Sequence, residues 1–207
     1  ISSVDASAPY ASADFVVGSS SLDQVSGTDD DRRMFFDKSE GAFRAGRVDG
    51  LQWDSDDIGG HSVGMGYNVT ASGTSSIALG ENVAALGDYS VAIGSASVAD
   101  NASSFAIGNN ADSESGNSMA LGFGVTTSAN NAIAIGNDTE ASGTYSMAIG
   151  LGDAATAPIV NGNNSLGIFM GDQSGVDLTD ANTMSIMGGQ VGIGTVSPDT
   201  EAMLHIV

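Results

Sequence analysis

The sequence predicts an all-β protein whose main part is a parallel β-roll, or solenoid, built from 14-residue coils. A motif of two apolar residues around a small one, followed by glycine, recurs seven times at intervals of 14 residues without insertion or deletion. Polar residues of the kinds that favour turns separate the motifs. Glycine is abundant at 29 residues and only 6% of the chain is aromatic, which favours thin repeated layers over one large core.

The chain is expected to divide into three regions. Residues 1–60 form a β-structured N-terminal cap, 61–158 the roll of seven repeats, and 159–207 an irregular C-terminal β segment. The stretch 34–53 contains three of the seven phenylalanines and the only tryptophan. We expect this aromatic group to seal the end of the roll, because the terminal coil of a solenoid otherwise exposes its interior.

Each coil is expected to begin with a strand in which apolar residues at positions i and i+2 flank a small residue. Period two is the pattern of a strand with one buried face, and helical spacing is absent. We therefore expect these doublets to form the core. The core doublets are Ile77 and Leu79, Val91 and Ile93, Phe105 and Ile107, Met119 and Leu121, Ile133 and Ile135, and Met147 and Ile149.

A glycine follows each doublet and is expected to turn the chain, because glycine adopts positive φ without a Cβ penalty. A second, weaker strand is expected after each of these turns, on apolar residues such as Val69, Ala71, Val125 and Ala141. The structural turn glycines are Gly66, Gly80, Gly94, Gly108, Gly122, Gly136 and Gly150.

Stacking of such coils pairs every strand with its equivalent above and below, about 4.8 Å away. A coil of 14 residues encloses few side chains, so a single roll leaves one apolar face exposed to water. Association of three chains around an axis would cover that face. We therefore expect a homotrimer, with the chain itself as a partner.

The charge distribution excludes several classes of partner. The formal net charge is −20, and all five basic residues lie between Arg32 and Arg47. A surface of this kind repels phosphate backbones and anionic headgroups, so nucleic-acid binding is not expected. No apolar stretch is long enough to cross a membrane, so membrane insertion is not expected either. The chain has no cysteine for a disulfide or a thiolate site.

No catalytic residue and no cofactor is expected, so the protein is not interpreted as an enzyme. His61 and His205 are isolated and have no nucleophile or second ligand nearby in the sequence. Two acidic clusters leave Ca²⁺ open as a ligand, since hard oxygen ligands suit that ion, although acidic runs are more often solvated turns. The candidate side chains are Asp29, Asp30, Asp31, Asp54, Asp56 and Asp57.

The stretch SSIALGENVAALGDYSVAIGSASVADNASSFAIG resembles the head repeats of trimeric autotransporter adhesins. The resemblance covers residues 61–158, about half of the chain, with the 14-residue register kept throughout. It implies a left-handed roll and a homotrimer. It also implies a protein exposed outside the cell that binds other surfaces.

Both ends of the chain resemble parts of phage tail fibres. The segment MFFDKSEGAFRAGRVDGLQWDSDDIGG is similar to the lead-in to such repeats, and VGIGTVSPDTEAMLHIV is similar to the stretch before a self-cleaving chaperone. These resemblances favour an extracellular tail-fibre segment of a phage or virus particle that displays a surface for a host glycan or protein receptor. The alternatives are the head of a bacterial trimeric adhesin on the cell surface and the subunit of an extracellular filament.

Receptor contacts are expected at turns, where the repeat tolerates change. Four turn residues differ strongly between coils and are therefore the candidates for contact. They are Tyr67, Glu81, Phe123 and Leu151.

Overall fold

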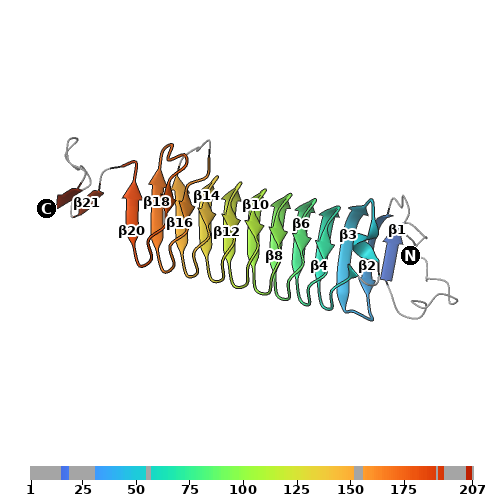
Figure 1. Cartoon of the computed structure of the whole chain (residues 1–207). Coiled ribbons are helices and arrows are strands. Elements are labelled where there is room, and N and C mark those ends of the chain that lie inside the picture. Colours follow the sequence, from blue (N-terminus) through green and yellow to red (C-terminus); the bar gives the residue numbers. More distant parts are fainter. Residues whose placement is uncertain are drawn as a thin grey trace.

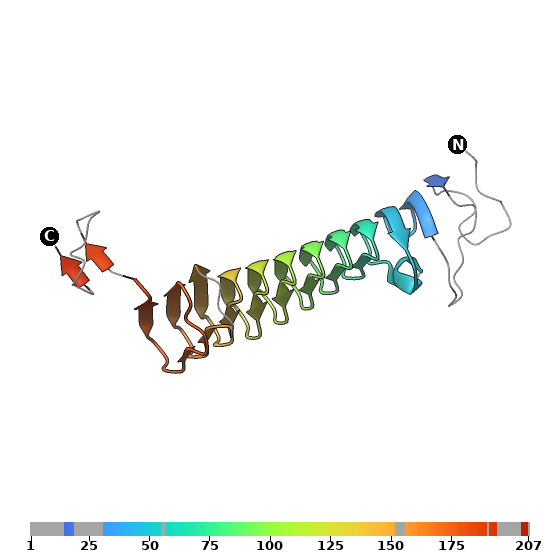
Figure 2. The same cartoon turned by 90° about the horizontal axis from the view of Figure 1, so that it is seen from above.

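The computed structural model describes residues 15–18, 31–54, 57–151, 156–189, 191–193 and 204–206. These residues form a rod of stacked coils in which a row of long strands and a row of short strands run side by side (Figures 1 and 2). One 3-10 turn, η1 (Leu51–Trp53), accompanies the strands, and the described residues contain no α-helix. The predicted fold class, an all-β parallel solenoid with a 14-residue repeat, is confirmed.

The long strands form one 12-stranded sheet in the order β1-β2-β3-β4-β6-β8-β10-β12-β14-β16-β18-β20. Strands β1 to β3 form an antiparallel meander, and every later neighbour is parallel. The bounds are β1 Phe15–Gly18, β2 Asp31–Asp37, β3 Ala42–Val48, β4 Val63–Tyr67, β6 Ile77–Glu81, β8 Val91–Ser95, β10 Phe105–Asn109, β12 Met119–Phe123, β14 Ile133–Asn137, β16 Met147–Leu151, β18 Leu166–Met170 and β20 Met184–Met187.

The short strands form an 8-stranded parallel sheet, and two further strands pair with each other near the C-terminus. The short strands are β5 Thr70–Ala71, β7 Ala84–Ala85, β9 Val98–Ala99, β11 Asp112–Ser113, β13 Thr126–Thr127, β15 Glu140–Ala141, β17 Ile159–Val160 and β19 Asp177–Leu178; the separate pair is β21 Val191–Ile193 and β22 Leu204–Ile206.

The roll continues past residue 158, where the separate C-terminal segment was expected to begin. Strand β18 pairs in parallel with β16, and β20 pairs with β18, so two further coils join the same sheet. The break in period comes from extra residues between the long and the short strand of these coils, which lengthen one turn. The partners Met147 and Leu166, and Leu166 and Met184, show that the strand register survives the longer turns.

The interior is filled by small side chains. The second residue of each regular long strand is alanine, and the alanines at 78, 92, 106, 120, 134 and 148 are all fully buried. Buried serines precede the strands, and Val69 and Ala71 with their equivalents close the interior from the short sheet, as expected for the second strand. In the regular coils this narrow interior holds alanine, serine, threonine and valine side chains, and the larger buried side chains of Arg44 and Phe169 lie in the flanking coils.

The predicted core doublets do not line this interior, so their assignment to the core of the single roll is corrected. Successive side chains of a strand point to opposite faces. Because alanine takes the inward position, both members of each doublet point outward. None of them is buried in the single chain, and Ile77, Phe105, Met119 and Leu121 are between 36% and 39% exposed.

The predicted turn glycines also have a different role. They occupy the fourth position inside the long strands, and six of them have φ between +125° and +147°; Gly150 is the exception. A Cβ at Gly108 would overlap the carbonyl oxygen of Gly122 in the next coil, and the other five positive-φ glycines meet the next coil in the same way. Glycine is therefore required by the close approach of neighbouring backbones.

The turn itself comes two residues after the glycine. Its residues have φ between +42° and +62°, in the left-handed region, where asparagine and aspartate are tolerated best. They are Asn68, Asn82, Ala96, Asn110, Gly124 and Asp138.

At the N-terminal end, Arg44 occupies the position that alanine fills in later coils. It lies opposite Gly64 and is fully buried. One guanidinium nitrogen donates to the carbonyl of Ser62 at 3.2 Å, and the other donates to the Ser62 hydroxyl and to the Ala71 carbonyl, both at 2.9 Å. Burial lowers the pKa of Arg44 to about 10, against the opposing effect of Asp37, so the side chain remains charged at neutral pH.

Aromatic residues close the same end, beyond Arg44. Phe35 and Trp53 are buried and meet edge to face, with ring centroids 5.8 Å apart. The Arg33 guanidinium lies 5.0 Å from the centre of the Phe35 ring. These contacts cover the first coil where the parallel stack stops.

The glycines at the fourth position of the long strands give a first testable prediction. Gly108→Ala should lower the free energy of unfolding by about 3 kcal/mol or more, because the methyl group overlaps the next coil and φ is positive. Gly116→Ala is the matched control, since the nearest atoms to an added Cβ there are at 3.5 and 3.6 Å, and it should cost nothing or stabilise slightly. Urea unfolding followed by circular dichroism measures both, and equal losses would contradict the argument.

The buried Arg44 gives a second testable prediction. Arg44→Ala should destabilise the protein by about 3 kcal/mol, because it opens a cavity and removes the donors bound to Ser62 and Ala71. The exposed Arg32 serves as control, and Arg32→Ala should change stability by less than about 0.5 kcal/mol. Urea unfolding again measures the difference; a loss confined to Arg32→Ala would refute the role given to Arg44.

Candidate adhesive surface

The outer side of the long sheet is apolar without interruption, and we call it the apolar face. In-register pairing aligns equivalent residues of nine coils into two ladders. One ladder is Val63, Ile77, Val91, Phe105, Met119, Ile133, Met147, Leu166 and Met184; the other is Met65, Leu79, Ile93, Ile107, Leu121, Ile135, Ile149, Ile168 and Ile186.

Every side chain of the apolar face is partly or fully exposed in the single chain. The exposed fraction reaches 43% at Met65 and 63% at Met184. Neighbouring coils cover the flanks of each side chain, and only the outward ends meet solvent. A continuous apolar surface of this length on a free monomer is unfavourable and marks an interface.

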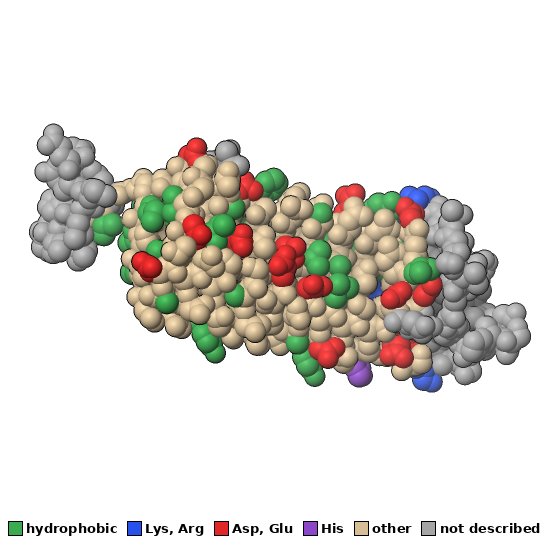
Figure 3. Space-filling model, in the orientation of Figure 1, with side chains coloured by type: hydrophobic (Ala, Val, Ile, Leu, Met, Phe, Trp, Pro, Cys, Tyr) green, Lys and Arg blue, Asp and Glu red, His purple; other side chains and the backbone are tan. Residues whose placement is uncertain are grey.

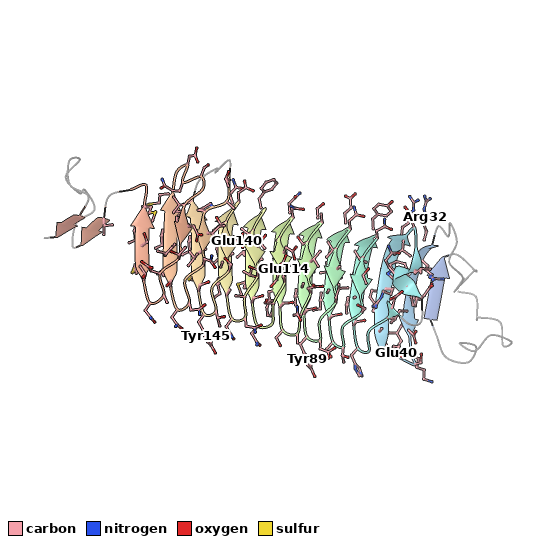
Figure 4. All side chains as sticks on the ribbon, in the orientation of Figure 1. Arg32, Glu40, Tyr89, Glu114, Glu140 and Tyr145 are labelled. Carbon is pink, nitrogen blue, oxygen red and sulfur yellow. The ribbon has the colours of Figure 1, made fainter. Side chains whose placement is uncertain are left out.

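The outer side of the short sheet is polar in comparison. One residue per coil points outward here, and carboxylates of the middle coils gather near it, including Glu114 and Glu140 (Figure 4). Acidic side chains are spread along the view of Figure 3, whereas basic ones lie at the N-terminal end. The pKa of Asp112 is raised, first by partial burial and then by the neighbouring charges of Glu114 and Asp100.

The four contact residues predicted to lie in turns are instead the last residues of long strands, each directly after the strand's glycine. They lie on one edge of the roll, which we call the first edge. Phe123 is 54% exposed and Leu151 is 61% exposed, so both are accessible in the single chain. Tyr67 has a structural partner, because its hydroxyl donates to Asp49 while Arg47 lies 5.3 Å from its ring centre. Glu81 is exposed.

The opposite edge contains the turns that lead from a short strand into the next long strand, and we call it the second edge. One residue per coil again has φ in the left-handed region, between 55° and 60°, and none of these residues is glycine. Sequence patterns did not single them out, although their 14-residue spacing is visible in the sequence. They are His61, Ser75, Tyr89, Ser103, Asn117, Asn131, Tyr145, Asn164 and Asn182.

Among the described residues, no group of three or more histidines and carboxylates lies close enough to bind a metal ion. Of the candidate Ca²⁺ ligands, Asp29, Asp30 and Asp56 lie outside the described residues, as does the side chain of Asp31. The same holds for the side chain of His205, whereas His61 is exposed on the second edge. No helix in the described part of the chain is long and apolar enough to span a membrane.

The chain is a parallel β-solenoid of 14-residue coils with an exposed apolar face. Residues 58–82, 85–111, 114–139 and 128–152 match the YadA head domain repeat. The seven regular coils of the roll are therefore similar to adhesin head repeats. No curated protein matches the chain.

The match lies within residues 58–152 and leaves the last two coils and both ends of the chain outside it. It therefore gives no support to the phage tail-fibre context, or to a virion location, which rested on the ends.

Asp112 gives a prediction for pH dependence. Because its folded pKa is raised, the folded state holds the proton more tightly than the unfolded state, and stability falls as pH rises from the ordinary aspartate value through the folded pKa. Asp112→Thr, which copies the equivalent Thr126, should remove this loss. Urea unfolding between pH 3 and 7 should show that the free energy of unfolding of the variant increases relative to that of the parent as pH rises.

Glu114→Gln is the companion to that variant. It should recover a smaller part of the lost stability, since burial contributes more than the Glu114 charge to the shift. Parent and Asp112→Thr curves that stay parallel across the pH range would contradict the assignment.

Proposed function

We propose that this chain forms the head of a homotrimeric, surface-exposed adhesin, with the roll as a stiff stalk-like body and the turns as contact surfaces. The observation that carries the proposal is the apolar face. Its two ladders hold nine apolar side chains each and contain no polar or charged residue. The match of the roll to YadA head repeats supports the adhesin class.

Association along the apolar face has a clear driving force. Each aliphatic side chain that becomes fully covered contributes on the order of 1 kcal/mol, at about 25 cal/mol per Å² of apolar area. Summed over the length of the rod, this is enough to offset the entropy lost on association. Closed rotational symmetry would use the same face in every chain and leave no apolar surface at the sides of the assembly.

The remaining surface fits display outside a cell. The turns and the outer side of the short sheet carry polar and acidic residues, and no lysine or arginine occurs after Arg47. A net charge of −20 per chain keeps neighbouring assemblies apart and disfavours nonspecific binding to nucleic acid or anionic lipid. Contact with a partner then depends on the exposed turns.

The assembly is tested by mass. Light scattering after size exclusion should give three times the 20.6 kDa mass of the chain. Ile107→Asp, at the centre of the apolar face, should dissociate the trimer because each chain then brings a carboxylate into an apolar contact. Thr126→Asp is the matched control on the short sheet, where the equivalent residue of the preceding coil is already aspartate, and it should leave the mass unchanged.

A monomeric parent protein would overturn the proposal. Dissociation caused equally by Thr126→Asp would show that a different face holds the chains together.

A further inference from the structure

We propose that the second edge binds an uncharged, extended polysaccharide between two tyrosine side chains, Tyr89 and Tyr145. The inference rests on the proposed function, because it names the class of ligand that an adhesin head of this sequence recognises. Both side chains point away from the roll on the same edge, the lower one in Figure 4. They are 63% and 64% exposed.

The backbone conformation of these residues shows that the turn alone does not explain them. Tyr89 and Tyr145 have φ of 59° and 57°, a region that costs a bulky residue on the order of 1 kcal/mol relative to glycine or asparagine. Asparagine occupies the same position in other coils, at Asn117 and Asn131, and would be the more stable choice. A tyrosine kept there in spite of that cost indicates a use for its side chain.

The spacing of the two rings suits an extended ligand. Tyr89 and Tyr145 occupy equivalent positions four coils apart, and at about 4.8 Å per coil they are separated by about 19 Å. Two aromatic groups at that distance can hold a chain of several sugar rings that runs parallel to the rod. Sugar rings present apolar C–H faces that stack on aromatic rings, while the tyrosine hydroxyl remains available for hydrogen bonding.

In the coils between the tyrosines, the left-handed residue of each turn and the residue before it are small and uncharged. The paired turn residues there are Ala102 with Ser103, Gly116 with Asn117, and Asn130 with Asn131. These small side chains leave the two rings as the highest points of the edge. Serine hydroxyls and asparagine amides can donate and accept hydrogen bonds, which matches the hydroxyl groups of a sugar.

The negative charge near the second edge disfavours anionic ligands. No basic residue lies in this part of the chain, and Asp88, Asp100 and Glu114 lie in turns of the same edge or at the ends of the strands that lead into them. Nucleic acids and acidic glycans would therefore be repelled. An uncharged polysaccharide can stack on the tyrosine rings, form hydrogen bonds with the asparagine amides and avoid repulsion by the carboxylates.

Affinity electrophoresis tests the inference. The full chain is run in native gels that contain mannan, dextran, laminarin or galactomannan, with alginate as an anionic probe. At least one neutral polysaccharide should retard the parent protein, and alginate should not. Tyr89→Asn or Tyr145→Asn should weaken retardation about tenfold, and the double variant should not be retarded.

Leu51→Asn is the control. It removes an exposed apolar residue from η1, away from the two tyrosines, and it should bind like the parent. The inference is overturned if no neutral polysaccharide retards the parent, or if Leu51→Asn weakens binding as much as the tyrosine variants. Tyrosine-dependent retardation by reduced and alkylated casein instead would assign the edge to peptide binding and also overturn it.

Light scattering of the double variant separates this inference from the proposed function. A trimer of unchanged mass that no longer binds the polysaccharide supports both. A trimer that never binds one overturns this inference alone, whereas a monomeric parent overturns the proposed function. A double variant that dissociates would place the tyrosines in the subunit interface and so refute the binding edge.

Discussion

In-register parallel pairing between coils is the constraint on which the rest of this structure depends. Each residue of a regular coil lies against the same position of the coil above and of the coil below, as Ile107 lies between Ile93 and Leu121. A side chain must therefore fit a copy of itself at about 4.8 Å. Alanine satisfies that condition inside the narrow roll, and glycine satisfies it where neighbouring backbones nearly touch. The four surfaces of the rod follow from this repetition.

The same constraint explains why the sequence predicted the repeat well and the core badly. Six identical intervals of 14 can be counted without any structure, and the paired long strands from β4 to β16 agree with that count. Period two identifies an alternating strand, but it does not say which face points inward. In a β-sandwich, whose core has room for large side chains, Ile77 and Leu79 would point inward. Here the coil is too narrow, so Ala78 is inside and the larger residues are on the outer face.

Other features had no local signal that sequence reasoning could use. Arg44 stands in a strand next to phenylalanine and alanine, and nothing nearby predicts a buried guanidinium. Its burial depends on Ser62 and Ala71, which are 18 and 27 residues away and meet it only when the first coil closes. The two coils after residue 158 were missed for a related reason, since longer turns disrupt the count of 14 while the strands keep their pairing. The tyrosines of the second edge could have been found, because the residues at 61, 75 and 89 already show the spacing.

Repetition also determines where recognition can evolve on such a rod. Interior positions of the regular coils accept only small residues, and a polar change on the apolar face would disturb the contacts with the neighbouring coils. The outer side of the short sheet offers one residue per coil, and a carboxylate there is disfavoured, since partial burial first and the charges of Glu114 and Asp100 second raise the pKa of Asp112. Turn residues extend beyond the stacked strands and are the least restricted by their copies. A ligand that discriminates this protein from another rod of the same repeat must therefore contact the turns, and an isolated aromatic residue such as Tyr89 changes that surface without changing the roll.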